Sequence, residues 1–522
     1  MPTAPEKGPA RVDNPATDLI SALKPFDQHN RELAANVHPS DWQNPEPKPR
    51  YDLVVIGAGT AGLVTAAGAA GLGASVALIE KDLMGGDCLN VGCVPSKALI
   101  RAARVCAEVR RSGAYGVLLN GPISTDFPAI MERMRKLRAG ISHHDSARRF
   151  QGLNVDLFFG QGVFNSGTGI NVGTQQLRFA KAVIATGARA VELPIPGIRD
   201  AGYLTNETIF SLTTLPPRLA VIGAGPIGCE LAQAFARFGS KVTLFEQQKQ
   251  LLVREDRDAA AVIERALLND GVQINRDCRI TNIARQGSEK LLTLEGSDSS
   301  TIQAFDEILI AVGRAPNIEH LNLEAAGVRY DARSGVHVDD HLRTTNRRIF
   351  AAGDICFPSK FTHTADAMAR IVIQNALFFG RKKVSALTIP WCTYTEPEIA
   401  HVGLYPAEAE AKGIAMETIM VGLEEVDRAV LDAQTEGFLK VHVQKKTGRI
   451  LGATLVANHA GDIISELTVA MCAGVSLGKI GSVIHPYPTQ AEVIKRAGDK
   501  FNRTRLTPRA KKLLALLLKL NR

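Results

Sequence analysis

The sequence contains no run of about 20 apolar residues, the length that a membrane-spanning helix requires. Its first residues also lack the basic start and the apolar run of a secretion signal. Cysteine is sparse, and six of the eight cysteines stand alone: Cys106, Cys229, Cys278, Cys356, Cys392 and Cys472. Isolated cysteines do not make a disulfide framework, so they favour a reducing compartment. We therefore expect a soluble, cytoplasmic protein.

The rest of the composition is that of an ordinary globular protein. Hydrophobic residues make up 45% of the chain and the mean hydropathy is +0.00. At 522 residues the chain is too long for one hydrophobic core, so we expect three or four domains. The net charge of +8 is mild for this length and gives no reason to expect a nucleic-acid partner.

A dinucleotide-binding pattern occurs twice. The sequence GAGTAG begins at Gly57 after an apolar strand, and GAGPIG begins at Gly223 after another. In each copy an acid, Glu80 or Glu246, ends a strand 18 residues after the third glycine. Such glycines alone also occur in plain structural turns. With a strand before them, a helix after them and the acid beyond, they predict a site where a pyrophosphate meets a helix start and the acid binds ribose.

The two remaining cysteines lie just after the first copy, in GGDCLNVGCVPSK, which contains Cys88, Cys93 and Lys97. Half of a zinc site, or two inert buried cysteines, are the alternatives. A zinc site needs more ligands, and the sequence offers no second CxxC or nearby group of histidines. A helix start and Lys97 nearby would favour the reactive thiolate. The pattern predicts a redox-active pair of thiols beside a dinucleotide.

These motifs, in this order, resemble the class I pyridine nucleotide-disulfide oxidoreductases, among them lipoamide dehydrogenase, glutathione reductase and mercuric reductase. The resemblance covers about residues 51–498. It implies an α/β fold with two Rossmann-like dinucleotide-binding domains, for FAD and NAD, and a C-terminal α+β dimerisation domain. The implied divisions are an N-terminal extension (1–50, with a helix-like piece near 19–23), an FAD domain (51–215 and 316–385), an NAD domain (216–315), the dimerisation domain (386–498) and a basic amphipathic tail (499–522).

The same resemblance assigns roles around the thiols. It implies a redox-active Cys88–Cys93 disulfide, with Cys93 next to the flavin and Cys88 as the outer thiol. It also implies an ion pair of Lys97 and Glu230 near the flavin N5. Residues five apart on a regular helix point about 140° apart, so the bridge needs a distorted turn, and Gly92 lies where that distortion would be.

The cofactor contacts follow from the two glycine patterns and three further segments. Strand 349–352 runs into Gly353-Asp354, and similar strands place the acid against the flavin ribityl chain. Segments 183–187 and 308–314 resemble crossover strands between the nucleotide domains. The predicted FAD residues are Gly57, Gly59, Gly62, Glu80, Lys97, Gly187 and Asp354, and the predicted NAD residues are Gly223, Gly225, Gly228, Glu246 and Gly313. No metal site is predicted.

The acid at position 246 bears on the choice between NADH and NADPH. A carboxylate there holds the two ribose hydroxyls of NAD and repels the 2′-phosphate of NADP. The next two residues are glutamines rather than arginines. We therefore expect NADH as the preferred reductant, with NADPH as the alternative because Lys249 and Arg254 lie close in sequence.

The acceptor depends on the motif HPYPTQAE, which ends at Glu492. Lipoamide dehydrogenase and glutathione reductase read His-Pro-Thr-x-x-Glu here, with the imidazole as general base. Alignment on Pro488, Thr489 and Glu492 puts Tyr487 at the base position. A phenol with a pKa of about 10 is a poor proton acceptor at neutral pH. His485 is interpreted as a packing residue, with a base role as the alternative.

Mercuric reductase also has a tyrosine at this place, because its thiol-bound metal needs ligands more than a proton acceptor. The extra cysteine pairs of that branch are absent here, and Asp87 stands where the family more often has Thr. Our leading hypothesis is a homodimeric FAD enzyme that uses NADH to reduce the disulfide, which then reduces a disulfide or a thiol-bound metal such as Hg(II). Tyr487 would act from the other subunit, oriented by Glu492. Dihydrolipoyl dehydrogenase, soluble transhydrogenase and non-enzymatic membrane-tethered flavoprotein are the alternatives.

The last twenty residues are basic and rich in leucine. Thr507-Pro508 predicts a helix start there. A helix of this kind either lies on an anionic membrane surface or packs its leucines on its own domain or dimer mate. We favour packing within the protein.

Overall fold

The computed structural model describes residues 23–119, 121, 123–295 and 300–521. Nearly all of the helical piece expected around residues 19–23 therefore lies outside the described residues. Helix α2 (Gln28–Val37) buries Leu33 and Val37 in the core beneath the first sheet. The indole of Trp42 donates a hydrogen bond to the carbonyl of Leu157 at 3.3 Å. The end of the predicted extension is thus packed onto the first nucleotide-binding unit.

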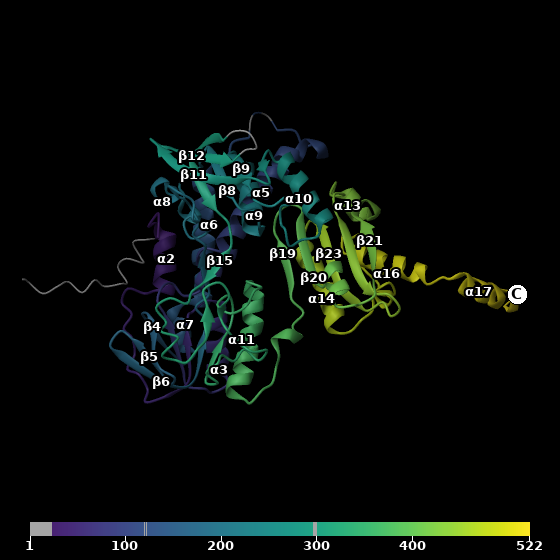
Figure 1. The fold of residues 1–522 in the computed structure, drawn as a ribbon. Coiled ribbons are helices and arrows are strands. Elements are labelled where there is room, and N and C mark those ends of the chain that lie inside the picture. The colour runs from purple at the N-terminus through teal and green to yellow at the C-terminus, as the bar shows by residue number, and fades with distance from the viewer. Residues whose placement is uncertain (1–22, 120, 122, 296–299, 522) are drawn as a thin grey trace, which may run out of the picture.

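The first sheet lies at the lower left of Figure 1 and comes from two separate parts of the chain. Its strands are β1 (Tyr51–Ile56), β2 (Val76–Glu80), β3 (Val155–Phe159), β4 (Gly162–Ser166), β5 (Gly169–Val172), β6 (Gln175–Ile184) and β18 (Ile349–Ala351). They run in the order β3-β2-β1-β6-β5-β4, with β18 parallel to β6. Strand β1 is buried almost throughout because it lies between two parallel neighbours.

Helices cover this sheet, and two of them contain the cysteine segment. They are α3 (Thr60–Gly71), α4 (Gly86–Asn90), α5 (Cys93–Arg111), α6 (Phe127–Ser142), α7 (Ala147–Gly152) and α11 (Thr362–Leu377). Helix α3 is mostly alanine and glycine, and its small side chains let it lie close to both β1 and α11. Helix α5 packs against α6 and against a helix of the second unit, so it connects the two units.

The second unit repeats the parallel arrangement on a smaller scale. Its sheet has the order β10 (Gln273–Asn275), β9 (Lys241–Phe245), β8 (Arg218–Ile222) and β14 (Glu307–Ile310). Its helices are α8 (Ile198–Ala201), α9 (Pro226–Phe238) and α10 (Arg257–Asn269), and an antiparallel sheet of β11 (Arg279–Gln286), β12 (Glu289–Glu295) and β13 (Thr301–Phe305) lies beside them. All pairings within the four-stranded sheet are parallel, as a Rossmann-like unit requires.

Two short antiparallel strands join the units. Strand β7 (Ala188–Ala190) leads out of the first sheet and β15 (Arg314–Pro316) leads back to it. Segments 183–187 and 308–314 were expected to be these crossovers. They contain the last residues of β6 and β14 and lead directly into the crossover pairing, which begins after Gly187 and Gly313. A small hairpin of β16 (Tyr330–Asp331) and β17 (Gly335–Val336) follows.

The C-terminal unit is an antiparallel sheet with helices on it, at the right of Figure 1. The sheet order is β19 (Pro390–Thr393), β20 (Glu398–Gly403), β23 (Ile450–Ala457), β22 (Phe438–Gln444) and β21 (Met416–Gly422). Its helices are α12 (Pro406–Ala411), α13 (Asp427–Leu431), α14 (Ala460–Cys472), α15 (Leu477–Ile480) and α16 (Glu492–Thr504). The three units confirm the predicted fold class: two Rossmann-like units and a C-terminal α+β unit.

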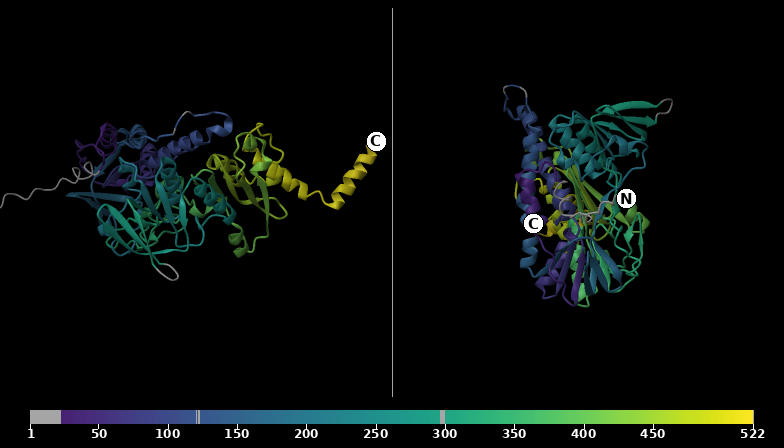
Figure 2. Two further views of the ribbon diagram at one scale, coloured as in Figure 1. Left: turned by 90° about the horizontal axis from the view of Figure 1, so that it is seen from above. Right: turned by 90° about the vertical axis from the view of Figure 1, so that its left-hand side faces the viewer.

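The last helix, α17 (Pro508–Leu520), projects from this body, as Figures 1 and 2 show. None of its residues is buried. Of the two packing arrangements expected for its leucines, packing on the chain's own C-terminal domain is wrong, because the chain leaves the surface between α16 and α17. Packing on a dimer mate stays a prediction. Within the part of the chain that is described, no helix is both long and apolar enough to cross a bilayer.

Candidate active site

The two predicted redox cysteines lie on either side of a break between two helices. Cys88 is in the short helix α4, and Cys93 is the first residue of the 19-residue helix α5. A Cβ at Gly92 would lie 2.7 Å from the carbonyl oxygen of Asp87, so the chain can turn this tightly only with glycine here. The distorted turn that the sequence required at Gly92 is present. Both cysteines are free thiols in the structure.

The pKa values of the two thiols are shifted in opposite directions. The pKa of Cys93 is lowered to about 6, mainly by a hydrogen bond from Cys88. Thr362 and the cation of Lys97 lower this pKa further. The Thr362 hydroxyl lies 3.5 Å from the Cys93 sulfur. The same hydrogen bond and burial raise the pKa of Cys88. Once reduced, the pair therefore holds one thiolate, on Cys93, and one thiol, on Cys88, at neutral pH.

The Lys97 ammonium and the Glu230 carboxylate form an ion pair that joins the two nucleotide-binding units. Their Nζ and Oε2 atoms are 2.8 Å apart, and Glu230 is almost fully buried. The second oxygen of Glu230 accepts a hydrogen bond from the backbone N–H of Tyr394 at 2.9 Å. Burial opposes a charge on Lys97, but the carboxylate outweighs it and raises the lysine pKa. The structure thus places a fixed cation one helical turn from Cys93.

The two glycine patterns have nearly the same geometry. Gly57 and Gly223 both take left-handed conformations, with φ of +100° and +103°. A Cβ at Gly62 or Gly228 would lie 1.8 or 1.9 Å from the carbonyl oxygen of the first glycine of its own copy. Only glycine fits at these four positions, because each needs either a positive φ or a very close backbone approach.

The acids that follow the two patterns also have matching contacts. Glu80 accepts a hydrogen bond from the N–H of Ala58 at 2.6 Å, and Glu246 accepts one from Ala224 at 2.9 Å. Each also accepts from the N–H two residues further on, at 2.7 and 2.9 Å. Burial raises the pKa of Glu80 to about 7. The acids therefore lie against the glycine turns, where a ribose would meet them.

The residues of the first copy fit the predicted FAD. Helices α3 and α9 begin after Gly59 and Gly225, and neither has a side-chain cap, so their first N–H groups are available to a pyrophosphate. Gly86, just before the cysteines, approaches Gly59 so closely that a Cβ on it would lie 2.7 Å from the Cα of Gly59. Any side chain on Gly86 would fill the space beside the first glycine turn.

Asp354 is linked to the cysteine segment through Arg314. The guanidinium Nε lies 3.6 Å from the Asp354 carboxylate, and Nη2 forms an ion pair with Asp87. Burial raises the pKa of Asp354. Asp87, which stands where the family more often has Thr, therefore has a partner on β15. Gly187 and Gly313, with φ of +70° and +60°, directly precede β7 and β15.

Tyr487 lies on the surface of the C-terminal unit and is 70% exposed. Its hydroxyl donates a hydrogen bond to Asp427 at 3.0 Å, which raises the phenol pKa. Glu492, the first residue of α16, contacts Arg496 instead, at 3.3 Å, and Arg496 lies 3.5 Å from Asp427. In the protomer the direct partner of Tyr487 is therefore Asp427, and not Glu492 as expected.

The imidazole of His485 has little access to solvent. Its side chain is 6% exposed, and Nε2 lies 3.0 Å from a carboxylate oxygen of Glu466 on α14. Nδ1 lies 3.2 Å from the carbonyl oxygen of Val483. Both ring nitrogens face acceptor oxygens within the unit, and the near absence of solvent access favours the packing interpretation over a base that meets a substrate.

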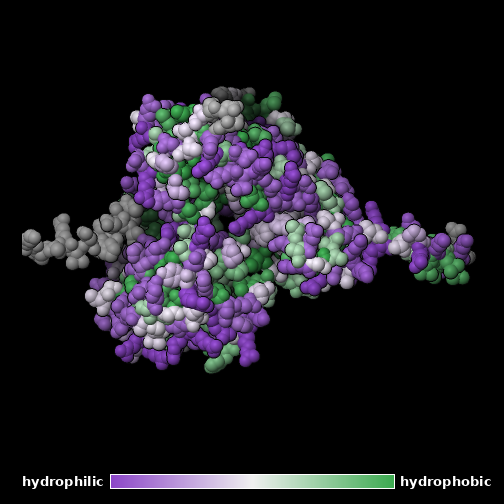
Figure 3. Space-filling model, in the orientation of Figure 1, coloured by the Kyte–Doolittle hydropathy of each residue, from purple (hydrophilic) through white to green (hydrophobic). Residues whose placement is uncertain are grey.

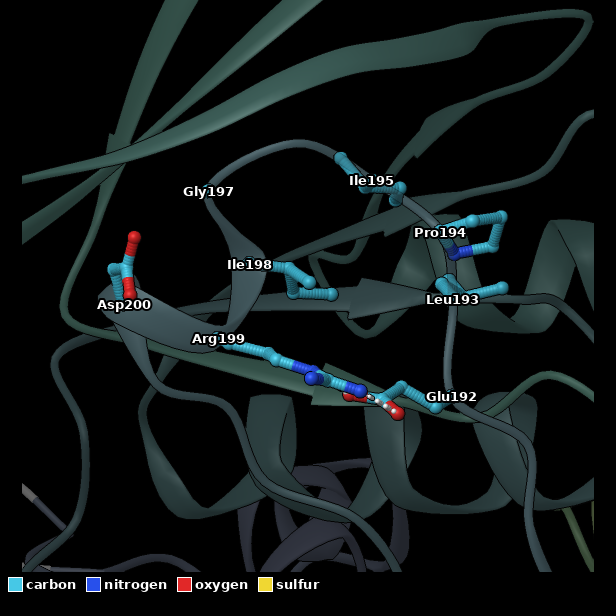
Figure 4. Close-up of a pocket in the computed structure, with 8 residues that line it drawn as sticks. All are labelled: Glu192, Leu193, Pro194, Ile195, Gly197, Ile198, Arg199 and Asp200. Carbon is cyan, nitrogen blue, oxygen red and sulfur yellow. Dashed lines mark hydrogen bonds and ion pairs between the residues drawn. The ribbon is translucent and has the colours of Figure 1, made fainter.

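Two surface pockets lie in the second unit. The larger, about 430 Å³, is lined by residues 192–200 with an ion pair of Glu192 and Arg199, and Figure 4 shows these side chains. It contains none of the predicted site residues. The second, about 400 Å³, is lined by Gln247, Gln248 and Lys249 among others and begins directly after Glu246.

The sequence analysis did not identify four residues that contact the site: Thr362, Tyr394, Asp427 and Arg314. No local motif marks them, because each meets its partner from a distant part of the chain. In the described part of the chain, no group of three or more His, Cys, Asp and Glu side chains is arranged to hold a metal ion.

Comparisons with known proteins agree with this geometry. Residues 51–370 match the family model described as pyridine nucleotide-disulphide oxidoreductase, and residues 389–498 match the dimerisation domain of the same family. A mercuric reductase from Streptomyces lividans is 35% identical over 457 residues, which cover 86% of this chain and 96% of the relative. A dihydrolipoyl dehydrogenase from Chlamydia muridarum is 32% identical over 453 residues, which cover 85% and 95%.

A solved structure has the same fold. It is the Cu(II) complex of the HOCl-induced flavoprotein disulfide reductase RclA from Escherichia coli. The TM-score is 0.76 and the sequence identity 30%, over 85% of this chain and 98% of the other.

Proposed function

This chain belongs to the pyridine nucleotide-disulphide oxidoreductase family, and on that premise we propose that it uses NADH to reduce a thiol-bound metal ion such as Hg(II), or a small disulfide. Two electrons and one proton leave NADH and open the S–S bond between Cys88 and Cys93. The proton stays on Cys88, and Cys93 remains a thiolate. When the disulfide forms again, Cys88 releases its proton and the two electrons of the thiol pair reduce thiolate-bound Hg(II) to Hg(0), which sets its thiolate ligands free, or split an acceptor disulfide into one thiol and one thiolate.

The observation that carries this proposal is the polarised thiol pair at the start of α5. FAD, when bound, relays the electrons between the nicotinamide and the disulfide. The chain's own residues hold the charges in place: the hydrogen bond from Cys88 and the ammonium of Lys97 stabilise the negative charge on Cys93. Glu230 fixes Lys97 through their 2.8 Å contact. A thiolate stabilised in this way is what disulfide exchange and soft-metal binding both require.

The preference for a metal acceptor rests on Tyr487. The hydrogen bond to Asp427 raises the pKa of a group that already titrates near 10, so the phenol accepts no proton at neutral pH. A dithiol substrate needs a base to remove its proton, whereas a metal–thiolate complex needs only ligands. The mercuric reductase relatives support this choice over the dihydrolipoyl dehydrogenase relative.

The rival reactions have less support. Lipoamide oxidation would need His485 as base, and both of its ring nitrogens are engaged inside the unit. A soluble transhydrogenase passes electrons between nicotinamides and needs no dithiol, yet the polarised pair is present. For the reductant, Glu246, which accepts a hydrogen bond from Ala224 in the second glycine turn, supports NADH, while Lys249 in the lining of the second pocket keeps NADPH as the alternative.

The matched dimerisation domain and the surface around Tyr487 support a homodimer as part of this proposal. The neighbouring Ile484 is 94% exposed and Val483 45%. An apolar surface strip of this kind is typical of a contact between subunits. We propose that Tyr487 acts on the thiols of the partner subunit, so the acceptor site is complete only in the dimer.

An acceptor panel tests the proposal. The FAD-loaded enzyme would receive NADH and, separately, mercuric ion with excess thiol, lipoamide, glutathione disulfide and a nicotinamide analogue. We expect mercuric ion to give the highest kcat/KM, and Cys88→Ser to abolish its turnover. Turnover that survives in Cys88→Ser would contradict a dithiol mechanism. Faster turnover of lipoamide or of the nicotinamide analogue would place one of the rival reactions first.

A further inference from the structure

The C-terminal twenty residues, 503–522, form a cationic tail that differs from the rest of the chain. They contain seven Lys and Arg residues and no Asp or Glu: Arg503, Arg505, Arg509, Lys511, Lys512, Lys519 and Arg522. Subtracting these seven charges from the net charge of +8 leaves +1 for residues 1–502. Nearly all of the net charge is therefore in the tail, and the body is close to neutral.

Helix α17 sorts its side chains onto two faces. At 100° per residue, its six leucines fall on a broad face, and Lys511, Lys512 and Lys519 fall in the remaining arc. Arg509, in the first turn, lies at the angle of the leucine face. The hydroxyl of Thr507 caps the helix by accepting from the N–H of Ala510 at 3.2 Å. The leucines are between 48% and 76% exposed. Figure 3 shows hydrophobic residues gathered at the far end of the projecting helix.

This apolar face needs a surface to cover it. A 13-residue helix without packing is only marginally stable in water, and six exposed leucines on it are unfavourable. The matched family domains end at residue 498, before this helix begins. It follows α16, which is anchored by Val493, Ile494 and Phe501 in the core of the C-terminal unit.

Charge selects among the possible covering surfaces. A second copy offers a body with almost no net charge and another tail of seven positive charges, so it has no net charge complementary to the tail. Nucleic acid would match the cations but has no apolar surface for the leucines. Anionic lipid headgroups match the cations, and the acyl region beneath them accepts the leucines. We propose that α17 is an interfacial anchor that binds the enzyme to membranes containing anionic lipid.

The anchor lies in the membrane plane and does not cross it. Thirteen residues extend about 20 Å as a helix, against a hydrocarbon core of about 30 Å. Arg505 to Thr507 separate α17 from α16, so the helix can lie flat while the folded body remains in water.

Co-sedimentation of the full-length FAD-loaded enzyme with vesicles tests the proposal. We expect binding to phosphatidylcholine vesicles that contain about a third of phosphatidylglycerol, loss of binding at high salt, and little binding to phosphatidylcholine alone. Lys511→Gln with Lys512→Gln should weaken binding roughly 30-fold. The exposed pair Lys445→Gln with Lys446→Gln, which lies outside the tail, is the matched control and should bind like wild type.

A second pair of variants tests the apolar face. Leu517→Glu should abolish vesicle binding, and Leu72→Glu, at an equally exposed leucine of the body, should not. Unchanged flavin absorbance and NADH oxidation would show that both variants are folded. Equal binding to neutral and anionic vesicles, equal losses in variants and controls, or tighter binding to duplex DNA than to vesicles would overturn the proposal. So would conversion of the dimer to a monomer when residues 506–522 are deleted.

Discussion

Lys97 and Glu230 meet at 2.8 Å although they belong to helices of different nucleotide-binding units. Glu230 is 4% exposed, so its charge is tolerable only because the ammonium and the N–H of Tyr394 both contact it. The pair therefore does two things at once. It holds α5, which begins at Cys93, in register with α9, and it fixes a cation near the thiolate.

Loss of this cation should move the thiolate titration. We expect that Lys97→Met raises the pKa of Cys93 above about 6, because the attraction to the ammonium is lost while the negative charge of Glu230 remains. The reactive thiolate would then appear only at higher pH. The acceptor half-reaction should therefore lose activity near pH 7 and recover as pH rises. Stopped-flow reoxidation of the reduced enzyme against pH measures this.

Lys136→Met is the matched control for that prediction, since Lys136 is an exposed lysine of α6. Its profile should keep the wild-type midpoint. A Lys97→Met profile with the same midpoint as wild type would show that the ammonium does not act on Cys93.

The two thiols should differ in their spectra. A thiolate against an oxidised flavin gives a long-wavelength absorbance band. The Cys88→Ser variant should show this band without any reductant, and Cys93→Ser should lack it. Because the hydrogen bond from Cys88 is the main cause of the low Cys93 pKa, the band in Cys88→Ser should titrate above about 6. No band in Cys88→Ser even at alkaline pH, or a band in Cys93→Ser, would reverse the assignment of inner and outer thiol.

Much of the fold could be predicted because its signals are local. The glycine patterns, their flanking strands and the acids 18 residues on lie within about 30 residues of each other, and the structure repeats their contacts almost atom for atom. The break between α4 and α5 at Gly92 is likewise determined by the residues of one short segment.

The contacts that complete the site leave no such trace. Arg314 meets Asp87 across 227 residues, and Asp427 meets Tyr487 across 60. Ion pairs and hydrogen bonds of this kind depend on the folded arrangement and have no periodicity. The leucine pattern of α17 correctly predicted a helix, but a pattern records only that one face is apolar, and it does not record what covers that face.

The nicotinamide preference should depend on the charge of Glu246. We expect wild type to have the higher kcat/KM with NADH, and Glu246→Arg to narrow or reverse the difference, because a guanidinium attracts the 2′-phosphate that a carboxylate repels. Glu246→Gln is the matched variant: it keeps an acceptor for the N–H of Ala224 but removes the charge. The ratio of its kcat/KM with NADH to that with NADPH should lie between the ratios of wild type and Glu246→Arg. A wild-type preference for NADPH would contradict the interpretation of the second nucleotide site.

The acceptor chemistry should depend on Tyr487 but the NADH half-reaction should not. The phenol is exposed and bound to Asp427, and no proton is removed from it at neutral pH, so its role is to position or ligate the acceptor. Tyr487→Phe should slow the acceptor half-reaction and leave reduction of the enzyme by NADH nearly unchanged. Tyr330→Phe is the control, because Tyr330 is also an exposed phenol that donates to a carboxylate, at 2.5 Å from Glu324.

Tyr487→His is the sharper version of this test. An imidazole titrates near neutral pH, and a positioned base contributes ~10²–10⁴-fold to proton transfer. The variant should therefore gain turnover with lipoamide or glutathione disulfide while it loses turnover with mercuric ion. If wild type already reduces lipoamide at ordinary enzyme rates, the phenol is not what limits dithiol chemistry. The base would then have to be His485, which would first need to leave Glu466 and turn toward solvent.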